Sequence, residues 1–388
     1  MKINEISKRL DEIKETGRLR VIEDLRMETA TSGIGNNGKR YIVFNSNNYL
    51  GMTHEKSVQA AAQKALIYGT GSGGARLTSG ASFEWSSLEK ELASFKHGEA
   101  ALVFNTGYMT NLGVLYGLAG EGDVIFSDAL NHASIIDGCR ISKAKTVVYR
   151  HSDMKHLEKL LKKTHCRGQR FIVTDGVFSM DGDLAPLPEL ISLKKAYGAV
   201  LIIDDAHGTG VVGETGRGTT EYFHIHGADI LVGTLSKALG AEGGYAVADR
   251  EICEYLRNVS RPFIFSTALP ASLGAAALEA LRLLEQSPDY YMKRLQFCTD
   301  YMRKRLSEAG LPVIYGHTPI IPILIGDEKK AVRFADACKA EGVLLSAIRP
   351  PSVPEGTSRI RLTVTAAHTE EELEKGASVI IKKWRESR

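Results

Sequence analysis

The stretch at residues 199–210, A-V-L-I-I-D-D-A-H-G-T-G, decides the fold that we predict for this chain. Residues 199–203 are all apolar, and two carboxylates, a histidine and two glycines follow them directly. An apolar run that ends abruptly in charge is typical of a strand buried on both faces, as in a parallel sheet. Ligands of open α/β sheets bind beyond the carboxyl ends of the strands. We therefore expect Asp204, Asp205 and His207 at a binding edge, and an ordinary strand exit into solvent is the alternative.

Strand and helix patterns alternate on both sides of this stretch. Apolar runs predict strands at 101–105, 123–126, 146–149, 171–175, 200–204, 229–234 and 244–248. The segments between them mostly have helical periodicity, as in D-M-K-H-L-E-K-L-L-K-K at 153–163. Alternation of this kind predicts an α/β fold with a largely parallel seven-stranded sheet covered on both faces.

After Pro288 the pattern changes to that of a small α+β domain. Helical patterns at 290–309 and 328–341 are interspersed with strand patterns, and a final helix follows. Those strands are predicted at 312–315, 320–326, 344–348 and 359–365. We divide the chain into an N-terminal segment (1–48), a large domain (49–287) and a small C-terminal domain (288–388).

The first residues predict an amphipathic helix at 3–26 with a break near Gly17. This segment is charged at helical spacing and lacks the apolar centre of a signal peptide. Arg18 and Arg20 follow the break, where they could bind an anion or form a solvated face.

Composition excludes several classes of partner. The 49 Lys and Arg nearly balance the 46 Asp and Glu, and a net charge of +3 does not favour nucleic acid or an anionic membrane. The five cysteines are widely spaced, with no C-x-x-C pair, so neither disulfides nor a zinc site is indicated. No apolar run approaches the ~20 residues that span a bilayer. We expect a cytoplasmic protein with reduced thiols.

A glycine-rich loop at 69–80, G-T-G-S-G-G-A-R-L-T-S-G, matches G-x-G-x-x-G. A dinucleotide fingerprint follows a strand and opens a helix, whereas this loop follows a predicted helix at 55–67. We therefore disfavour a nucleotide-dependent oxidoreductase and interpret the loop as flexible or substrate-facing.

Polar groups gather at the predicted carboxyl ends of several strands. The sequence T-G-Y at 106–108 opens a helix, whose backbone N–H groups could hold an anion. The other groups are Ser127, Asp128, Asn131, His132, Ser179, Met180, Asp181, Asp204, His207, Thr234, Ser236 and Lys237. Each alone could be surface polarity, but together they meet the needs of one cofactor.

Pyridoxal phosphate needs a lysine, an acid beside its ring nitrogen, phosphate ligands and a flat side chain against its ring. Lys237, Asp204, the turn at 107–108 with Thr234, and His132 supply these in turn. A zinc hydrolase would want H-E-x-x-H or similar spacing, and a serine hydrolase would want G-x-S-x-G. The chain has neither.

Four segments resemble a known family, the α-oxoamine synthases. They are V-T-D-G-V-F-S-M-D-G-D (173–183), D-D-A-H-G-T-G (204–210), T-L-S-K-A-L-G (234–240) and F-S-T-A-L-P (265–270), and the resemblance runs from about residue 18 to 380. These are fold-type I pyridoxal phosphate enzymes that condense an amino acid with an acyl thioester and lose carbon dioxide. The resemblance also implies a homodimer with a shared site.

The resemblance implies a role for each matching residue around the cofactor. Lys237 would bind the cofactor and move the Cα proton, Asp204 would pair with the ring nitrogen, and His132 would stack on the ring. The remaining contacts are His207 and Ser179 to the ring hydroxyl; Gly107, Tyr108, Thr234 and, across the dimer interface, Thr267 to the phosphate; and Arg361 with Asn47 to the amino acid carboxylate. Arg20 is a candidate for the anionic end of the acyl donor.

The segment at 347–369, with those at 149–154 and 130–138, is most similar to family members that join L-alanine to a pimeloyl thioester in biotin synthesis. Members that use glycine and acetyl-CoA are the alternative. The donor's carrier, CoA or an acyl carrier protein, stays open. Trp85 and Ala75 depart from the family pattern, and we expect both on the substrate side.

Overall fold

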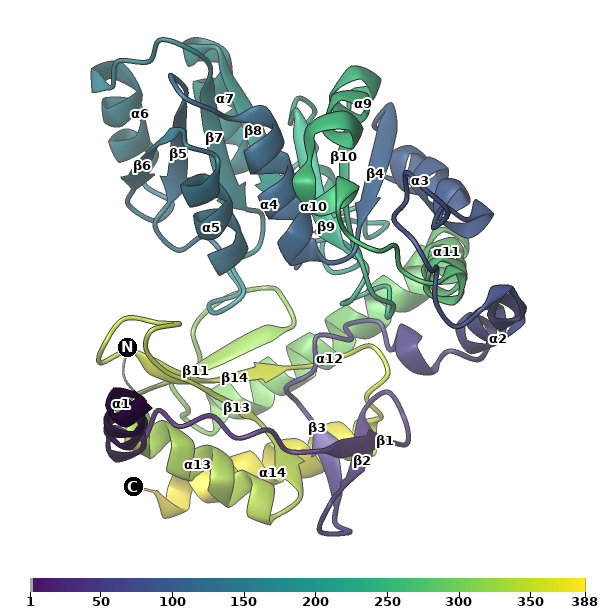
Figure 1. Cartoon of the computed structure of the whole chain (residues 1–388). Coiled ribbons are helices and arrows are strands. Elements are labelled where there is room, and N and C mark those ends of the chain that lie inside the picture. The colour runs from purple at the N-terminus through teal and green to yellow at the C-terminus, as the bar shows by residue number, and fades with distance from the viewer. Residues whose placement is uncertain (1–2, 388) are drawn as a thin grey trace. The chain divides into compact units, whose positions relative to one another are not determined.

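The structure, a computed structural model, describes residues 3–387 (Figure 1). The described chain forms two compact units. The smaller contains the chain up to Ser46, Met180–Gly182 and the chain from Gln296, and the larger contains Asn47–Ser179 and Asp183–Leu295. No helix within residues 3–387 is both long and apolar enough to cross a membrane.

Seven strands of the described chain form the sheet of the larger unit, in the order β4-β10-β9-β8-β7-β5-β6 (Figure 1). Only β10 runs antiparallel to its neighbours within this sheet. The strands are β4 (Ala100–Phe104), β5 (Val124–Asp128), β6 (Lys145–Tyr149), β7 (Arg170–Asp175), β8 (Ala199–Asp204), β9 (Ile230–Thr234) and β10 (Gly244–Ala248). The predicted α/β fold with a mostly parallel seven-stranded sheet is confirmed.

The central strand β8 is buried almost throughout, as its apolar run predicts. Its Ile202 packs in a core with side chains of β4, β5, β7, β9 and of helices that cover the sheet. The helices of this unit are α2 (Lys56–Ala65), α3 (Phe83–Phe95), α4 (Gly107–Leu118), α5 (Ala133–Ile141), α6 (Met154–Lys163), α7 (Leu187–Tyr197), α8 (Thr219–Tyr222), α9 (Arg250–Val259), α10 (Arg261–Ile264) and α11 (Ala271–Gln286). Two short 3₁₀ helices, η1 (Met52–His54) and η2 (Leu66–Tyr68), flank α2. Because packed apolar side chains cover both faces of the sheet, polar side chains that could bind a ligand are confined to the ends of the strands.

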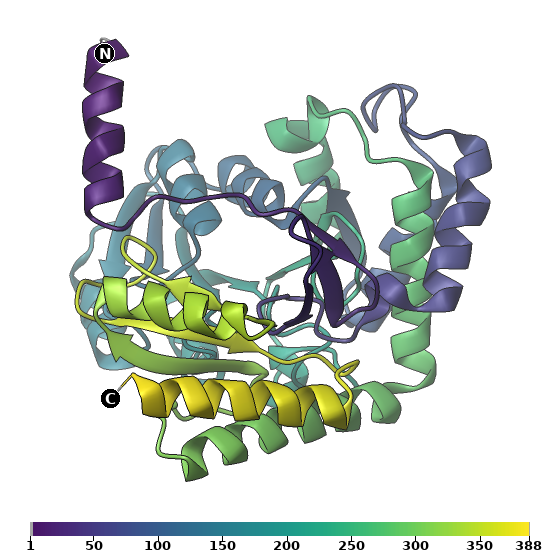
Figure 2. The same cartoon turned by 90° about the horizontal axis from the view of Figure 1, so that it is seen from below.

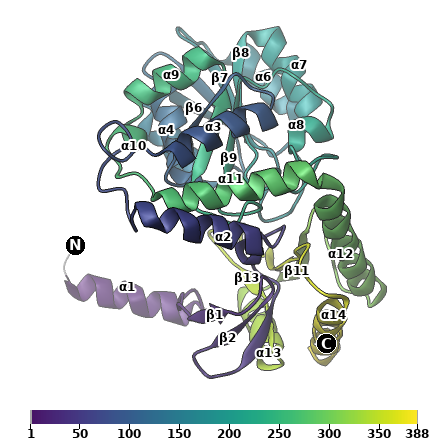
Figure 3. The same cartoon turned by 90° about the vertical axis from the view of Figure 1, so that its right-hand side faces the viewer.

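Trp85 lies inside the larger unit, where α3 packs against α11, and Figure 3 shows these two helices beside α2. Its side chain is buried, and its indole N–H donates to the carbonyl of Leu269 at 3.0 Å. A Cβ at Gly274 would come within 3.1 Å of the indole ring, so glycine at this position leaves room for the ring. The expectation that Trp85 faces substrate is wrong, because its ring fills a helix–helix contact.

The smaller unit contains two sheets. One has the order β1-β2-β3-β12 and the other the order β11-β14-β13. The strands are β1 (Leu25–Met27), β2 (Ser32–Gly35), β3 (Arg40–Val43), β11 (Ile320–Gly326), β12 (Val343–Leu344), β13 (Ser346–Ile348) and β14 (Ser358–Thr363). Its helices are α1 (Ile3–Glu15), α13 (Glu328–Ala340), α14 (Glu370–Glu386) and most of α12 (Pro288–Glu308). Figure 2 shows α13 and α14 side by side, and the two helices are in contact.

Three predicted elements of the smaller unit are wrong. The N-terminal helix stops at Glu15, and Gly17 takes a φ of 69°, so the second half of 3–26 is not helical. The segment 312–315 makes only an isolated bridge between Val313 and Ile323, because Pro312 has no N–H to donate to a ladder. The segment 344–348 divides, with β12 pairing with β3 and β13 pairing with β14.

Candidate active site

A cavity of about 150 Å³ opens at the carboxyl ends of the parallel strands of the larger unit. All of its lining residues belong to that unit. They are Thr106, Gly107, Tyr108, Asn111, His132, Ser134, Asp175, Asp204, Ala206, His207, Thr234, Ser236, Lys237 and Glu242. The fold thus brings together residues that are as much as 136 positions apart in the chain (106 to 242).

Asp204 ends β8 and is the buried carboxylate of this cavity. Its Oδ1 accepts the backbone N–H of Ala206 at 3.0 Å, and its Oδ2 accepts Asn111 Nδ2 at 2.6 Å. Hydrogen bonds from N–H donors favour the ionised form of a carboxyl group. Asp204 is therefore arranged as a fixed negative charge facing the cavity.

Asp175 ends β7 and lies directly beside Asp204 in the parallel register. Burial and the adjacent Asp204 charge raise the pKa of Asp175 well above its usual range. Its Oδ2 accepts the backbone N–H of His132 at 2.7 Å. The raised pKa disfavours the ionised form of Asp175 next to Asp204.

His132 begins α5 as its N-cap. Its Nδ1 accepts from the backbone N–H of Ser134 at 3.3 Å and lies 2.7 Å from the Ser134 hydroxyl. Burial lowers the pKa of His132, Asp204 opposes that change, and nearby Lys237 adds to it. The lowered pKa and the accepting Nδ1 both favour a neutral imidazole, which can lie flat against another ring. Tyr108 meets this imidazole edge-on, with centroids 6.3 Å apart.

The start of α4 forms one end of the cavity. Thr106 caps the helix by accepting the N–H of Met109 at 3.0 Å, and Gly107 and Tyr108 follow. A Cβ at Gly107 would lie 3.2 Å from the Cβ of Thr234, so glycine lets the helix start close to the end of β9. The first N–H groups of a helix have no intrahelical acceptor and carry partial positive charge. Together with the Thr234 and Ser236 hydroxyls, 2.8 Å apart, they form a cradle suited to an anion such as phosphate.

His207 lies beyond the end of β8 and lines the same cavity as Asp204. Its Nδ1 lies 2.6 Å from the hydroxyl of Tyr49, and both side chains are buried. The Tyr49 hydroxyl also donates to Asn47 Oδ1 at 3.5 Å. Asn47 is thereby linked to His207 through Tyr49, although Asn47 does not line the cavity.

Ser179 and Thr267 belong to the larger unit but do not line this cavity. Thr267 is exposed, bridges to Ala75, and its carbonyl accepts Asn105 Nδ2 at 2.7 Å. Arg20 and Arg361 belong to the smaller unit, where Arg20 is exposed and Arg361 is buried on β14, donating to the Thr363 hydroxyl at 3.0 Å. The cavity gathers the other predicted site residues, namely Gly107, Tyr108, His132, Asp204, His207, Thr234 and Lys237.

Among the polar residues that line the cavity, sequence reasoning missed Asn111, Ser134, Asp175 and Glu242. Asn111 lies four residues after Gly107, and that spacing places both on one face of α4. The helical period was therefore the signal that could have identified it. Asp175 ends a predicted strand next to the one that Asp204 ends, but only the strand order reveals that they are neighbours.

Asp205 follows the end of β8 and has a different environment from Asp204. It accepts from Lys96 Nζ at 2.8 Å and from the Thr219 hydroxyl at 2.8 Å. The side chains of Lys96 and Asp205 are both fully buried. Lys96 also donates to the carbonyl of Arg217 at 2.6 Å. Asp205 therefore holds the loop after β8 in place.

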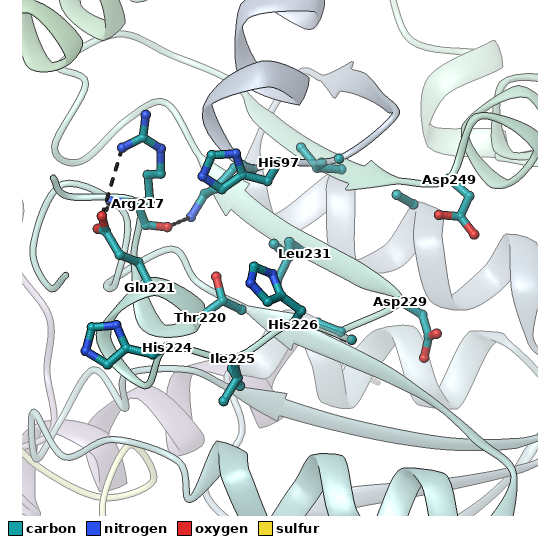
Figure 4. A pocket seen from close by; sticks show the side chains of 16 residues that line it. His97, Arg217, Thr220, Glu221, His224, Ile225, His226, Asp229, Leu231 and Asp249 are labelled. Atoms are coloured by element: carbon teal, nitrogen blue, oxygen red, sulfur yellow. Dashed lines mark hydrogen bonds and ion pairs between the residues drawn. The ribbon is translucent and has the colours of Figure 1, made fainter. Parts of the chain in front are cut away.

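A second cavity of about 350 Å³ lies near the start of β9 and the end of β10 (Figure 4), and Lys237 does not line it. His97, His224 and His226 line it, together with the basic Lys96 and Arg217 and the acidic Glu221, Asp229 and Asp249. Arg217 lies 3.9 Å from Glu221, and Lys194 pairs with Asp229 at 2.5 Å. Within the described chain no group of three or more His, Cys, Asp or Glu side chains is arranged to hold a metal ion.

The first cavity fits the chemistry of pyridoxal phosphate. An amine at Lys237, a buried carboxylate at Asp204, a neutral imidazole at His132 and the anion cradle at Gly107 meet in one place. The amine can form the imine with the cofactor, and the carboxylate can pair with the ring nitrogen. The imidazole can cover the ring, and the cradle can hold the phosphate.

Comparison with known proteins gives the family. Residues 39–380 match the family described as aminotransferase class I and II. The chain belongs to this family. It is 50% identical over 373 residues to 8-amino-7-oxononanoate synthase 2 of Bacillus subtilis (strain 168), covering 95% of each chain. It is 49% identical over 348 residues to 8-amino-7-oxononanoate synthase of Lysinibacillus sphaericus, covering 89% of each.

Solved structures agree with this family membership. A structure of serine palmitoyltransferase with pyridoxal phosphate superposes with a TM-score of 0.93 at 31% identity, covering 99% of this chain and 98% of that chain. The predicted fold-type I architecture and the predicted cofactor, pyridoxal phosphate, are confirmed. The resemblance to the α-oxoamine synthases is confirmed as well.

Proposed function

We propose that this chain condenses L-alanine with a pimeloyl thioester and releases carbon dioxide, the thiol and 8-amino-7-oxononanoate, a step of biotin synthesis. The observation that supports the chemistry is the buried Asp204, held by Asn111, in one cavity with Lys237 and His132. Identity near 50% over most of the chain to proteins named 8-amino-7-oxononanoate synthase supports the choice of substrates.

Pyridoxal phosphate, when bound, supplies an electrophilic carbon for the amino group and a ring that withdraws electrons from the substrate Cα. Asp204 holds a fixed negative charge that favours a proton on the ring nitrogen, and Asn111 keeps the carboxylate oriented. Lys237 holds the cofactor and moves the Cα proton at its Nζ. Neutral His132 covers the ring without adding a competing positive charge.

The remaining contacts are those that the sequence predicts. Gly107, Tyr108 and Thr234 hold the phosphate, and Thr267 of a second copy completes this set. His207, oriented by Tyr49, and Ser179 bind the ring hydroxyl. The alanine carboxylate is bound by Arg361 and Asn47, and the anionic end of the acyl donor by Arg20. That donor is pimeloyl-CoA or a pimeloyl acyl carrier protein.

A substrate panel tests this function. L-alanine, glycine and L-serine are each combined with pimeloyl-, acetyl- and palmitoyl-CoA, and thiol release is measured. We expect the highest kcat/KM for alanine with pimeloyl-CoA and a value about 10–200-fold lower when glycine replaces alanine, because a single methyl group is discriminated in that range. A maximum for glycine with acetyl-CoA would establish the glycine C-acetyltransferase alternative. A maximum for serine with palmitoyl-CoA would contradict both readings.

We also propose that two copies form the active assembly. The larger unit exposes large apolar side chains at Ile67, Tyr68, Phe83 and Phe265. Their segments meet through the Ala75–Thr267 bridge and a 2.6 Å hydrogen bond from the Ser72 hydroxyl to the Ala268 carbonyl. Apolar surface of this kind, next to a predicted cofactor ligand, suits a second copy of the same chain.

Sedimentation tests the assembly. Wild-type protein is expected to sediment as two chains, and Phe83→Asp combined with Phe265→Asp to sediment as one, because carboxylates would be buried in the interface. Tyr315→Asp, at an exposed aromatic of the smaller unit, is the control and should leave the mass unchanged. A monomeric wild type, or a double variant that stays dimeric, would contradict this proposal.

The cytoplasm is the proposed location. The five cysteines form no disulfide, and four of them are buried, consistent with a reducing compartment. Cell fractionation tests this placement, and recovery from a periplasmic or extracellular fraction would contradict it.

A further inference from the structure

His151, in the turn after β6, bridges two carboxylates of the larger unit. Its Nδ1 lies 2.9 Å from Oδ1 of Asp128, and its Nε2 lies 2.9 Å from Oδ2 of Asp183. An ionised carboxylate can only accept hydrogen bonds, so donating to both requires the doubly protonated imidazolium. His151 is therefore a charged link between two separate loops.

The first loop leads to His132. Asp128 ends β5, and its side chain is almost fully buried. Besides His151, it accepts the backbone N–H of Leu130 at 2.8 Å and that of Ser152 at 2.9 Å. The Asp128 carboxylate thereby fixes the backbone at Leu130, two residues before His132.

The second loop carries Ser179. Asp183 closes a hairpin in which its carbonyl accepts the N–H of Phe178 at 2.9 Å, next to a bridge between Val177 and Leu184. The Phe178 ring packs against His151 edge-on, with centroids 4.4 Å apart. His151 thus contacts both sides of the hairpin at the point where Ser179 leaves it.

We infer that His151 is a positioning residue for the cofactor site, tying the loop that presents His132 to the hairpin that presents Ser179. This inference rests on the proposed function, in which both of those side chains contact pyridoxal phosphate. His151 itself does not line the cavity, so it acts through the two loops.

The link from His151 to Asp128 and Asp183 depends on pH, because it requires the charged imidazolium. Although burial alone would lower it, Asp128 and Asp183 raise the pKa of His151 to about 10. Arg150 and Asp153 flank His151 but pair with each other at 2.6 Å near the surface. The pKa of His151 in the folded protein lies above the ordinary value of about 6.5. The charged His151 link therefore stabilises the fold fully below about pH 6.5, and this stabilisation is lost as pH rises through about 10.

The test measures cofactor retention by the holoenzyme. Wild type, His151→Asn and the control His156→Asn are loaded with pyridoxal phosphate, and its dissociation constant is obtained from the bound-cofactor absorbance after equilibrium dialysis. His156 lies on α6, and its ring Nδ1 accepts the N–H of Arg150 at 2.9 Å. At neutral pH we expect His151→Asn to bind about 10-fold more weakly, as is typical when an outer partner of a bound group is lost. His156→Asn should bind like wild type.

The pH series separates positioning from a general loss of stability. The difference between wild type and His151→Asn should shrink once the pH exceeds the pKa of His151, because wild type then loses the same charge. Equal dissociation constants at neutral pH, or a difference that does not change with pH, would overturn the inference.

A second variant covers the case in which His151→Asn does not fold. Asp183→Asn removes one partner and leaves the Asp128–His151 pair, so it should weaken retention in the same direction by a smaller factor. Unchanged retention in Asp183→Asn would overturn the inference. Wild type that retains no pyridoxal phosphate would instead contradict the proposed function, so the two failures are distinguishable.

Discussion

Replacing Lys237 with alanine is expected to abolish the visible absorption band of the purified protein and to lower kcat/KM by about 10⁴-fold, at the upper end of what a positioned proton-transfer group contributes. Lys237 is the only lysine among the cavity-lining residues that the structure describes. It lies three residues after Thr234, the last residue of β9, and lines the cavity with Thr234 and Ser236. The variant therefore loses both the amine that binds the cofactor and the group that moves the Cα proton.

The control for this prediction is Lys90→Ala, which removes an exposed lysine of α3 in the same unit. Its absorption band and kcat/KM should match those of wild type. A Lys237→Ala protein that still shows the band of covalently bound cofactor would contradict the assignment. Circular dichroism confirms that each variant is folded before the spectra are compared.

Asp204→Asn is expected to keep pyridoxal phosphate bound but to lower kcat by about 10²–10³-fold, as is typical when one electrostatic stabiliser is removed from an active site. The amide preserves shape but carries no negative charge, so a proton on the ring nitrogen is no longer favoured. Steady-state kinetics with alanine and pimeloyl-CoA give kcat, and the absorbance ratio gives the bound cofactor.

The adjacent Asp205→Asn is the matched control for Asp204→Asn. It leaves the fully buried Lys96 without its carboxylate, and breaking a buried ion pair costs about 3–5 kcal/mol of unfolding free energy. Urea unfolding should show that loss, whereas kcat per folded molecule should stay near the wild-type value. A similar loss of kcat in both variants, or wild-type kcat in Asp204→Asn, would contradict the distinction between the two carboxylates.

The larger unit could be predicted from the sequence because its strands are long apolar runs. Burial on both faces requires such runs, and β8 with its abrupt polar end is the clearest example. Strands β1 and β2 were missed because they have only three and four residues. The pairing of β3 with β12, about 300 residues later in the chain, was missed as well. No local periodicity encodes a contact of that kind.

The candidate site was predictable where one residue alone meets a chemical need, as Lys237 and Asp204 do. The site was less predictable where the three-dimensional arrangement decides which residues line it. Asn111 and Asp175 serve by orienting neighbours, and strand order and helix phase place them there. Trp85 shows the opposite error. Its departure from the family pattern suggested a place on the substrate side, but its side chain packs in a contact between two helices.

The most direct test of the central claim follows a labelled carbon. The holoenzyme is incubated with L-[1-¹³C]alanine and pimeloyl-CoA, and carbon dioxide and product are analysed by mass spectrometry. The proposed condensation predicts that the label leaves as ¹³CO₂, in amounts equal to the unlabelled 8-amino-7-oxononanoate formed and only when pimeloyl-CoA is present. Label retained in a condensed product, or ¹³CO₂ released without pimeloyl-CoA, would contradict it.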